Sequence, residues 1–336
     1  MYFLSNNNPN KLSLIAATLL FLTIAAMLIA MDRSTLLDND NYIEYFRGDR
    51  LLDIWNLLCE NLTIESLVLV FFSEEFIWLA FTKLLSEFFL PETATYILAL
   101  LVNFFVFLGC IKTDKPIVAA ILWVVIPVGF TTIGLFQLRQ GLAYSLFFYG
   151  TYYLKPGKFG LLSCGIHTTL AIPYIFYLVE LVFCRVKSWL VPAAFTAVLS
   201  WVMAAIGGYV FEIFGGRRLY SYSIGDGADS INYVMSALLF AAFYLSSYAH
   251  HYSQKNVAAR IFSLAGFGVS MFVTASFYIF PIGTSRVGYF LMLFALPLLA
   301  ESGALNPTKF KEPRVACGSL VILFIAYQAI KVLVTD

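Results

Sequence analysis

A guanidinium and two amides interrupt the apolar sequence at residues 136–147, FQLRQGLAYSLF. An uncharged run, 116–136, ends there, and another, 141–154, begins there. A charged side chain within a membrane span costs at least ~2.5–3.5 kcal/mol, so it usually faces a cavity or a partner. We therefore expect Arg139 and Gln140 to belong to a binding site. The alternative is an arginine that extends from a hairpin tip to the lipid headgroups.

His167 is the one histidine within an apolar run, and it lies in residues 159–183 together with Pro173. An imidazole can act as a general base near neutral pH. Irregular backbone at membrane depth is tolerated where it lines a cavity. We expect residues 159–183 to form a re-entrant hairpin, broken near Pro173, that brings His167 to the site. A histidine that is hydrogen-bonded to a neighbouring helix is the alternative.

Acidic and aromatic residues follow the first apolar run. Asp38 and Asp40 have a spacing that can hold a divalent metal against a diphosphate, or they can simply solvate a loop. Tyr45 follows them. Residues 73–85 have the pattern of an amphipathic helix at the outer membrane interface, with Glu75 among its polar positions.

Two later segments combine arginine with tyrosine. Arg217, Arg218 and Tyr220 lie in the turn-rich sequence GGRRLYSYSIGDGAD, and Arg286 and Tyr289 lie one helical turn apart. Arginine is preferred over lysine where a phosphate needs a planar pair of donors. Tyrosine rings stack on sugar rings, so such mixtures suit glycans. A solvated surface loop is the alternative for the first segment.

The composition is that of a membrane protein. Only 12% of the 336 residues are charged and 60% are hydrophobic, whereas a soluble domain carries about 25% charged residues. We therefore expect an all-α polytopic membrane protein, in contact with the lipid bilayer. The net charge of +1 argues against a basic surface for nucleic acid. The five cysteines form no CxxC pair, so we expect neither a disulfide framework nor a zinc site.

Apolar runs predict about nine transmembrane helices plus the re-entrant segment 159–183. The runs are 12–31, 93–110, 116–136, 141–154, 189–210, 233–249, 261–282, 287–300 and 315–330. No repeat or linker divides them, so residues 1–336 form a single transmembrane domain with two polar segments, 32–92 and 211–232. A re-entrant 159–183 places 12 of the 21 basic residues in the cytoplasm, and a full crossing places 9 there. The excess of basic residues in cytoplasmic loops favours the re-entrant topology, with both polar segments outside.

In this topology the candidate residues lie at the extracytoplasmic end of the membrane helices. The sequence contains no GxGxxG or P-loop pattern, and a reaction at the outer face cannot use cytoplasmic ATP or nucleotide sugars. A lipid-linked diphosphate can serve as the donor there. We expect the diphosphate to contact four arginines, Arg139, Arg286, Arg217 and Arg218. We expect the sugars to contact Gln140, Tyr45, Glu75, Tyr220 and Tyr289.

Five stretches of the sequence, in this order, resemble the EpsG family of Wzy-like polysaccharide polymerases. They are DNDNYIEYF (38–46), SEEFIWL (73–79), LRQGLAYSL (138–146), SCGIHTTLAI (163–172) and SRVGYF (285–290). The resemblance covers roughly residues 1–300, and its Arg-Gln and His elements are the most specific. Glu74-Glu75-Phe76 stands where the family commonly has Glu-Pro-Gly-Phe, and Asn39-Asp40 stands where it usually has Gly-x-Asp.

The resemblance implies an enzyme that polymerises undecaprenyl-diphosphate-linked oligosaccharides into O-antigen, capsule or exopolysaccharide. It implies a GT-C-like helical fold in the bacterial inner membrane, an active site facing the periplasm, and no metal or other cofactor. By that resemblance Arg139 and Arg286 would neutralise the leaving diphosphate, and His167 or Asp40 would deprotonate the acceptor sugar. A chain-length regulator in the membrane is expected as a further partner.

Two other functions compete with polymerisation. A flippase for lipid-linked oligosaccharides would need two pseudo-symmetric halves, and the sequence has no internal repeat. A membrane acyltransferase that modifies a surface glycan could also use His167, usually with a second catalytic His or Asp. A gel of the surface glycan from a deletion strain separates the three. Loss of a polymerase leaves a single repeat unit, loss of a flippase leaves none, and loss of an acyltransferase keeps the ladder.

The topology predicts that residue 220 is reached from outside the cell and that residues 155–158, 185–188 and 250–260 are reached from the cytoplasm. The physical reason is the bias of basic residues toward cytoplasmic loops. Labelling of single introduced cysteines with an impermeant thiol reagent measures this. Labelling of position 220 only from the cytoplasm would overturn the re-entrant topology.

Overall fold

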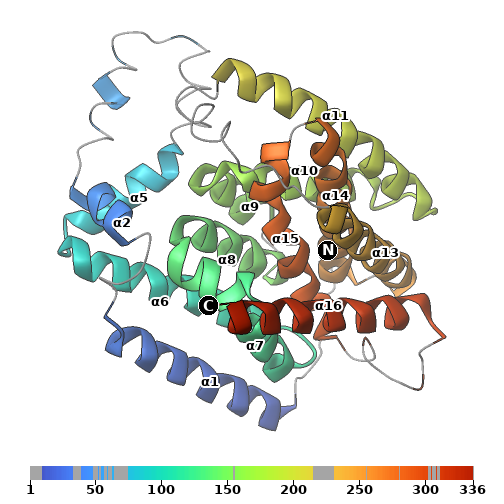
Figure 1. The fold of residues 1–336 in the computed structure, drawn as a ribbon, viewed down its shortest axis with the longest axis horizontal. Helices are drawn as coiled ribbons and strands as arrows, with labels where there is room; N and C mark the ends of the chain where they lie inside the picture. The colour runs from blue at the N-terminus through green and yellow to red at the C-terminus, as the bar shows by residue number, and fades with distance from the viewer. Residues whose placement is uncertain are drawn as a thin grey trace. The chain divides into compact units, whose positions relative to one another are not determined.

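The computed structural model describes residues 10–32, 39–47, 75–153, 156–214, 231–254, 256–279, 281–301 and 311–335, with single positions between 52 and 63 and at 304 and 308. Every regular element in these residues is a helix (Figure 1). Five of them are long and apolar enough to cross a membrane, and a sixth span results if α7 (Pro116–Val125) and η2 (Val128–Phe136) count as one. The all-helical, multi-pass class expected from the composition is confirmed.

The chain forms two compact units. The N-terminal unit comprises Pro9–Lys112 and Gly129–Ala171. Besides η2 it contains α1 (Lys11–Ala30), α2 (Asn39–Arg47), α5 (Phe76–Ser86), α6 (Pro91–Cys110), α8 (Leu138–Tyr152), α9 (Pro156–Ile166) and η3 (Thr168–Leu170). The C-terminal unit comprises Thr113–Val128 and Ile172–Asp336. Besides α7 it contains α10 (Ala171–Phe183), α11 (Leu190–Phe214), α13 (Ile231–Gln254), α14 (Val257–Ile279), α15 (Pro281–Leu299) and α16 (Pro313–Thr335).

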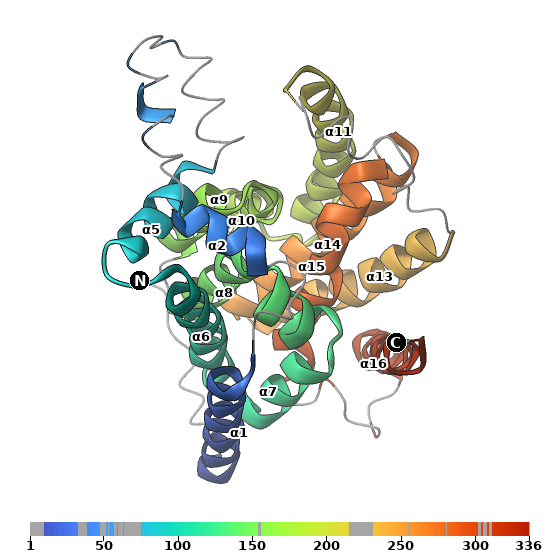
Figure 2. The same cartoon turned by 60° about the vertical axis from the view of Figure 1, so that its left-hand side comes forward.

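The N-terminal unit is built around α8, which is buried along almost its whole length. Helices α6 and α9 pack against it, and α2 packs against both α5 and α6. In both views α2 and α5 lie next to the start of α6 (Figures 1 and 2). The ends follow local sequence: the Asn10 side chain accepts a hydrogen bond from the Leu12 amide, 3.0 Å away, and α6 begins at Pro91.

Two apolar segments that look continuous in the sequence are broken. The run 116–136, predicted as one span, is interrupted at Ile126, which is extended because the next residue, Pro127, disfavours a helical conformation. The segment 159–183 is also broken, as expected, but the break lies at His167 and not near Pro173. Pro173 is in the first turn of α10, where a proline costs no hydrogen bond.

In the C-terminal unit α14 is the central helix, and it packs against α11, α13 and α15. Small residues allow this close packing, as is typical of membrane helices. A Cβ atom on Gly266 would lie 2.4 Å from the Tyr244 ring, and one on Gly268 would lie 2.3 Å from the Phe176 ring. The Ser200 hydroxyl donates to the Gly268 carbonyl, 3.0 Å away.

Gly141 fixes the approach of α8 to η2 in the N-terminal unit. A Cβ atom at this position would lie 2.0 Å from the carbonyl oxygen of Ile133, which is backbone and cannot rotate away. In the same region the Asn103 side chain donates to the carbonyls of Ala99, at 2.9 Å, and Gly134, at 3.2 Å. Glycine after the Arg-Gln pair is therefore a packing requirement.

We predict that Gly141→Ala destabilises the protein by about 1–3 kcal/mol, the usual cost of overpacking a core. The matched control is Gly207→Ala in α11, where a Cβ atom meets nothing within 4 Å. The control should be neutral or slightly stabilising, because alanine favours a helix over glycine. Thermal melting of the purified proteins in detergent measures both. A Gly141→Ala variant with the same melting temperature as the wild type would contradict the close contact between Gly141 and the Ile133 carbonyl.

Candidate active site

Glu75 begins α5 in an unusual backbone conformation. Its φ of 52° and ψ of 57° are left-handed, and it is the single non-glycine residue with positive φ among the described residues. This conformation costs an ordinary residue about 1–2 kcal/mol. Strain of this kind persists where surrounding contacts impose it. The Glu75 side chain is only 2% exposed, so the residue expected on the polar side of an interfacial helix is buried.

The Glu75 carboxylate is shared by a guanidinium and an imidazole. Its Oε2 lies 2.7 Å from Arg139 Nη1, and its Oε1 lies 2.9 Å from His167 Nδ1. The Thr168 amide also donates to Oε1, at 3.3 Å. Burial alone would raise the pKa of Glu75, but His167, Arg139 and the hydrogen bonds outweigh it and bring the pKa to about 2. Glu75, which lies outside the candidate spans, is therefore ionised at neutral pH.

Two tyrosines of α2 hold Arg139 from another side. The Arg139 amide donates to the Tyr42 hydroxyl, and Arg139 Nη1 donates to the Tyr45 hydroxyl, each at 3.3 Å. The Tyr45 ring centre is 5.8 Å from the guanidinium carbon, which allows a cation–π attraction. Both tyrosine rings meet the buried Trp78 ring edge-on at 6.0 Å. The start of α8 is thus tied to α2 and α5.

The break in the chain places His167. Its backbone is extended, with φ −147° and ψ 116°, between the end of α9 and the short helix η3. The His167 amide still donates to Ser163 at 2.9 Å, and its carbonyl accepts from Leu170 at 3.0 Å, so the break is well ordered by hydrogen bonds. A Cβ atom on Gly165 would lie 2.2 Å from Ile77, which shows how closely α9 approaches α5.

The three side chains of the cluster differ in their access to the surface. The side chains of Glu75 and His167 are 2% and 11% exposed, whereas that of Arg139 is 24% exposed. A carboxylate that holds one ring nitrogen of a histidine leaves the other nitrogen to take up a proton, as in hydrolase triads. An accessible arginine beside it can neutralise an anion. The cluster can therefore pair proton transfer with charge stabilisation.

A second cluster of the same three residue types lies in the C-terminal unit. His251 Nε2 is 2.7 Å from Glu301 Oε2, and Arg314 Nη1 is 3.4 Å from the same oxygen. These side chains are only 2%, 9% and 7% exposed. None of the three reaches the surface as Arg139 does, so this cluster resembles a buried structural ion pair.

The structure brings together four of the residues selected from the sequence, Arg139, His167, Glu75 and Tyr45. Gln140 is also buried, and its side-chain nitrogen has no hydrogen-bond partner in the described part of the chain. Asp40 is exposed on α2. Arg286 and Tyr289 lie on α15 of the C-terminal unit. The remaining candidates fall outside the described residues; they are Asp38, Arg217, Arg218 and Tyr220.

Sequence reasoning did not assign Tyr42, Trp78 or Thr168 to the site. Tyr42 precedes Tyr45 by about one helical turn, and Thr168 follows His167 directly, so both positions carried a local signal. Sequence reasoning also gave Glu75 a sugar contact, whereas its position makes it the common partner of Arg139 and His167. Nothing in the local sequence indicates that a glutamate would adopt left-handed backbone.

No curated protein and no solved structure matches the chain. The model of the EpsG family matches residues 14–336, which is nearly the whole chain. It therefore covers the acidic start of α5, the Arg-Gln step into α8 and the histidine after α9, all of which meet in the cluster. This chain belongs to the EpsG family, a family of Wzy-like polysaccharide polymerases.

Proposed function

We propose that this protein joins undecaprenyl-diphosphate-linked oligosaccharide repeat units at the periplasmic face of the bacterial inner membrane. The observation that carries the proposal is the buried carboxylate of Glu75 between Arg139 and His167. This arrangement provides a cation for a leaving diphosphate and an imidazole for proton transfer within one unit. Membership of the EpsG family supports a polymerase of polysaccharides as the reaction class.

Arg139 would stabilise the leaving group. Its side-chain contacts with Glu75 and Tyr45 both use Nη1. No side-chain contact with Nη2 or Nε is present in the described part of the chain, so these atoms can donate charge-assisted hydrogen bonds to the diphosphate oxygens. As the bond between the anomeric carbon and the diphosphate breaks, negative charge develops on the diphosphate. A fixed cation at that point lowers the barrier.

His167 would act as the general base. The acceptor sugar hydroxyl gives its proton to the imidazole, its oxygen attacks the anomeric carbon of the donor, and the lipid diphosphate leaves. Glu75 holds the ring through Nδ1 and favours the positive charge that the ring gains. Glu75 is therefore proposed as a positioning residue and not as a sugar contact. Asp40, exposed on α2, is the alternative base.

The remaining parts of the proposal concern substrate contacts and placement in the membrane. Arg286, Arg217 and Arg218 are proposed as further diphosphate ligands. Sugar contacts are proposed for Gln140, Tyr45, Tyr220 and Tyr289. A GT-C-like bundle of about nine spans with 159–183 re-entrant would hold them, and the helix break at His167 supports that arrangement. A chain-length regulator is a proposed partner.

We predict that Arg139→Ala lowers the rate of polymerisation by about a hundred- to thousandfold, the usual loss when a preorganised charge contact to the transition state is removed. His167→Ala should have a similar effect. The double variant should be scarcely worse than either single variant, because both groups serve one step. The measurement is the chain-length ladder of the surface glycan in a complemented deletion strain, with expression levels matched.

Arg47→Ala is the control for Arg139→Ala. Arg47 also lies on the N-terminal unit and pairs with Glu92 at 2.9 Å, but both side chains are more than half exposed. Exposed ion pairs contribute little, about 0–1 kcal/mol, so the ladder should be unchanged. A normal ladder from folded Arg139→Ala would contradict the role of Arg139. A strain that lacks even the single repeat unit would point to a flippase.

We also predict that polymerisation persists in EDTA, because the proposal assigns neutralisation of the diphosphate to arginine. Transfer from a lipid-linked donor by purified protein, before and after chelation, measures this. Loss of transfer in EDTA that magnesium or manganese restores would contradict the prediction. It would assign Asp38 and Asp40 as metal ligands.

A further inference from the structure

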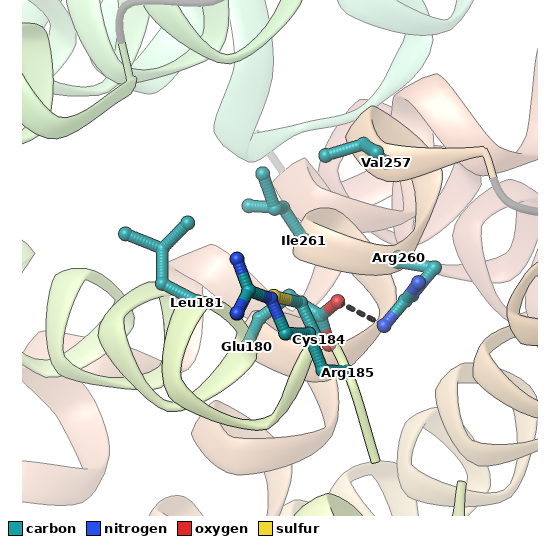
Figure 3. A pocket seen from close by; sticks show the side chains of 7 residues that line it. All are labelled: Glu180, Leu181, Cys184, Arg185, Val257, Arg260 and Ile261. Atoms are coloured by element: carbon teal, nitrogen blue, oxygen red, sulfur yellow. Dashed lines mark ion pairs between the residues drawn. The ribbon is translucent and has the colours of Figure 1, made fainter. Parts of the chain in front are cut away.

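A cavity of about 400 Å³ lies in the C-terminal unit, where α10 ends and α14 begins (Figure 3). It is lined from α10 and the turn after it by Glu180, Leu181, Cys184 and Arg185, and from α14 by Val257, Arg260 and Ile261. The lining is therefore both cationic and apolar, with two guanidinium groups and three aliphatic side chains. None of these residues belongs to the candidate active site.

The single carboxylate of the cavity is already engaged. Glu180 Oε1 lies 2.5 Å from Arg260 Nη2, and the Tyr248 hydroxyl donates to Glu180 Oε2 at 2.6 Å. Arg260 is buried, and its Nε has no hydrogen-bond partner within the described residues. A buried donor without a partner is unfavourable, so a ligand acceptor would stabilise it.

Arg185 supplies the excess positive charge. It is exposed on the turn that follows α10, and no carboxylate partner for it occurs among the described residues. The turn is held in place because the Tyr252 hydroxyl donates to the Val186 carbonyl. The Arg260 guanidinium in turn stacks on the Tyr252 ring, 4.2 Å from its centre. Tyr252 therefore fixes the Arg260 guanidinium and the backbone of the turn that carries Arg185.

The surroundings favour an anion that carries a hydrocarbon chain. Leu178 and Leu181 of α10, about one helical turn apart, are 40% and 37% exposed, so an apolar surface continues from the cavity lining along the helix. The cavity also lies at the N-terminus of α14, where the helix dipole favours negative charge. Basic pockets beside transmembrane helices bind lipid headgroups in this way.

We infer that this cavity binds the phosphate headgroup of an anionic bilayer phospholipid. Arg185 and Arg260 contact the phosphate, and the acyl chains lie along α10. The site is separate in role from the proposed polymerisation chemistry, so its test does not depend on enzymatic activity.

Cys184 provides a local readout, because its thiol lines the cavity and is partly exposed. The purified full-length protein in detergent is alkylated with N-ethylmaleimide, and each cysteine is followed by peptide mass spectrometry. Phosphatidylglycerol should slow the alkylation of Cys184. It should leave Cys59, which is exposed and does not line the cavity, unaffected. Phosphatidylcholine and inorganic phosphate should protect much less.

Arg185→Ala should weaken the protection by phosphatidylglycerol about ten- to hundredfold in lipid concentration, the value of a charge-assisted hydrogen bond. Lys187→Ala removes an exposed cation from the same turn that does not line the cavity, and should leave protection unchanged. Size-exclusion chromatography checks that both variants are folded.

The inference would be overturned by equal protection by phosphatidylcholine, equal protection by inorganic phosphate, undiminished protection in Arg185→Ala, or an equal loss of protection in Lys187→Ala. Protection by undecaprenyl phosphate without protection by phosphatidylglycerol would also overturn it, and would assign the cavity to the polyprenyl carrier.

Discussion

The buried carboxylate of Glu75 determines the arrangement of the candidate site. It is the one acidic group in contact with both Arg139 and His167 among the described residues, and these come from α8 and from the break after α9. Removing one member of a buried ion pair typically costs about 3–5 kcal/mol, because the other charge stays buried without compensation. That is larger than the cost of the left-handed backbone at Glu75, so the pairing can impose the strain. This carboxylate therefore ties the start of α5 to the start of α8 and to the break that leads into η3.

Residue types alone do not distinguish a reactive cluster from a structural one. His251, Glu301 and Arg314 repeat the composition of the Glu75 cluster at comparable distances. The clusters differ in backbone conformation and in solvent exposure. Glu75 and His167 lie in irregular backbone, and the Arg139 side chain is partly exposed to solvent. An ion pair that only holds helices together gains nothing from an accessible guanidinium. A site that must receive an anion requires one.

Hydropathy predicted the helices well, because burial of backbone polar groups in a bilayer requires helical segments. A helix lies at each of the nine apolar runs, with 116–136 broken in two. Arg139 and His167 could be selected because polar groups are rare in such runs. The role of Glu75 could not be predicted in this way, because its burial depends on how α8 and α9 pack against α5. Hydrophobic pattern and helix propensity do not determine that packing. The helix break was predicted near Pro173 but lies at His167, because a proline in the first turn of a helix does not disturb it.

The buried carboxylate of Glu75 also has a consequence for how the protein is made. The carboxylate is synthesised before either of its partners, since Arg139 and His167 lie later in the chain. Until both segments have entered the bilayer, the nascent chain carries an acidic group whose burial is uncompensated. The start of α5 can therefore reach its final position only after α8 and α9 are in place. Insertion of α5 into the membrane and closure of the Glu75 cluster are then separate events.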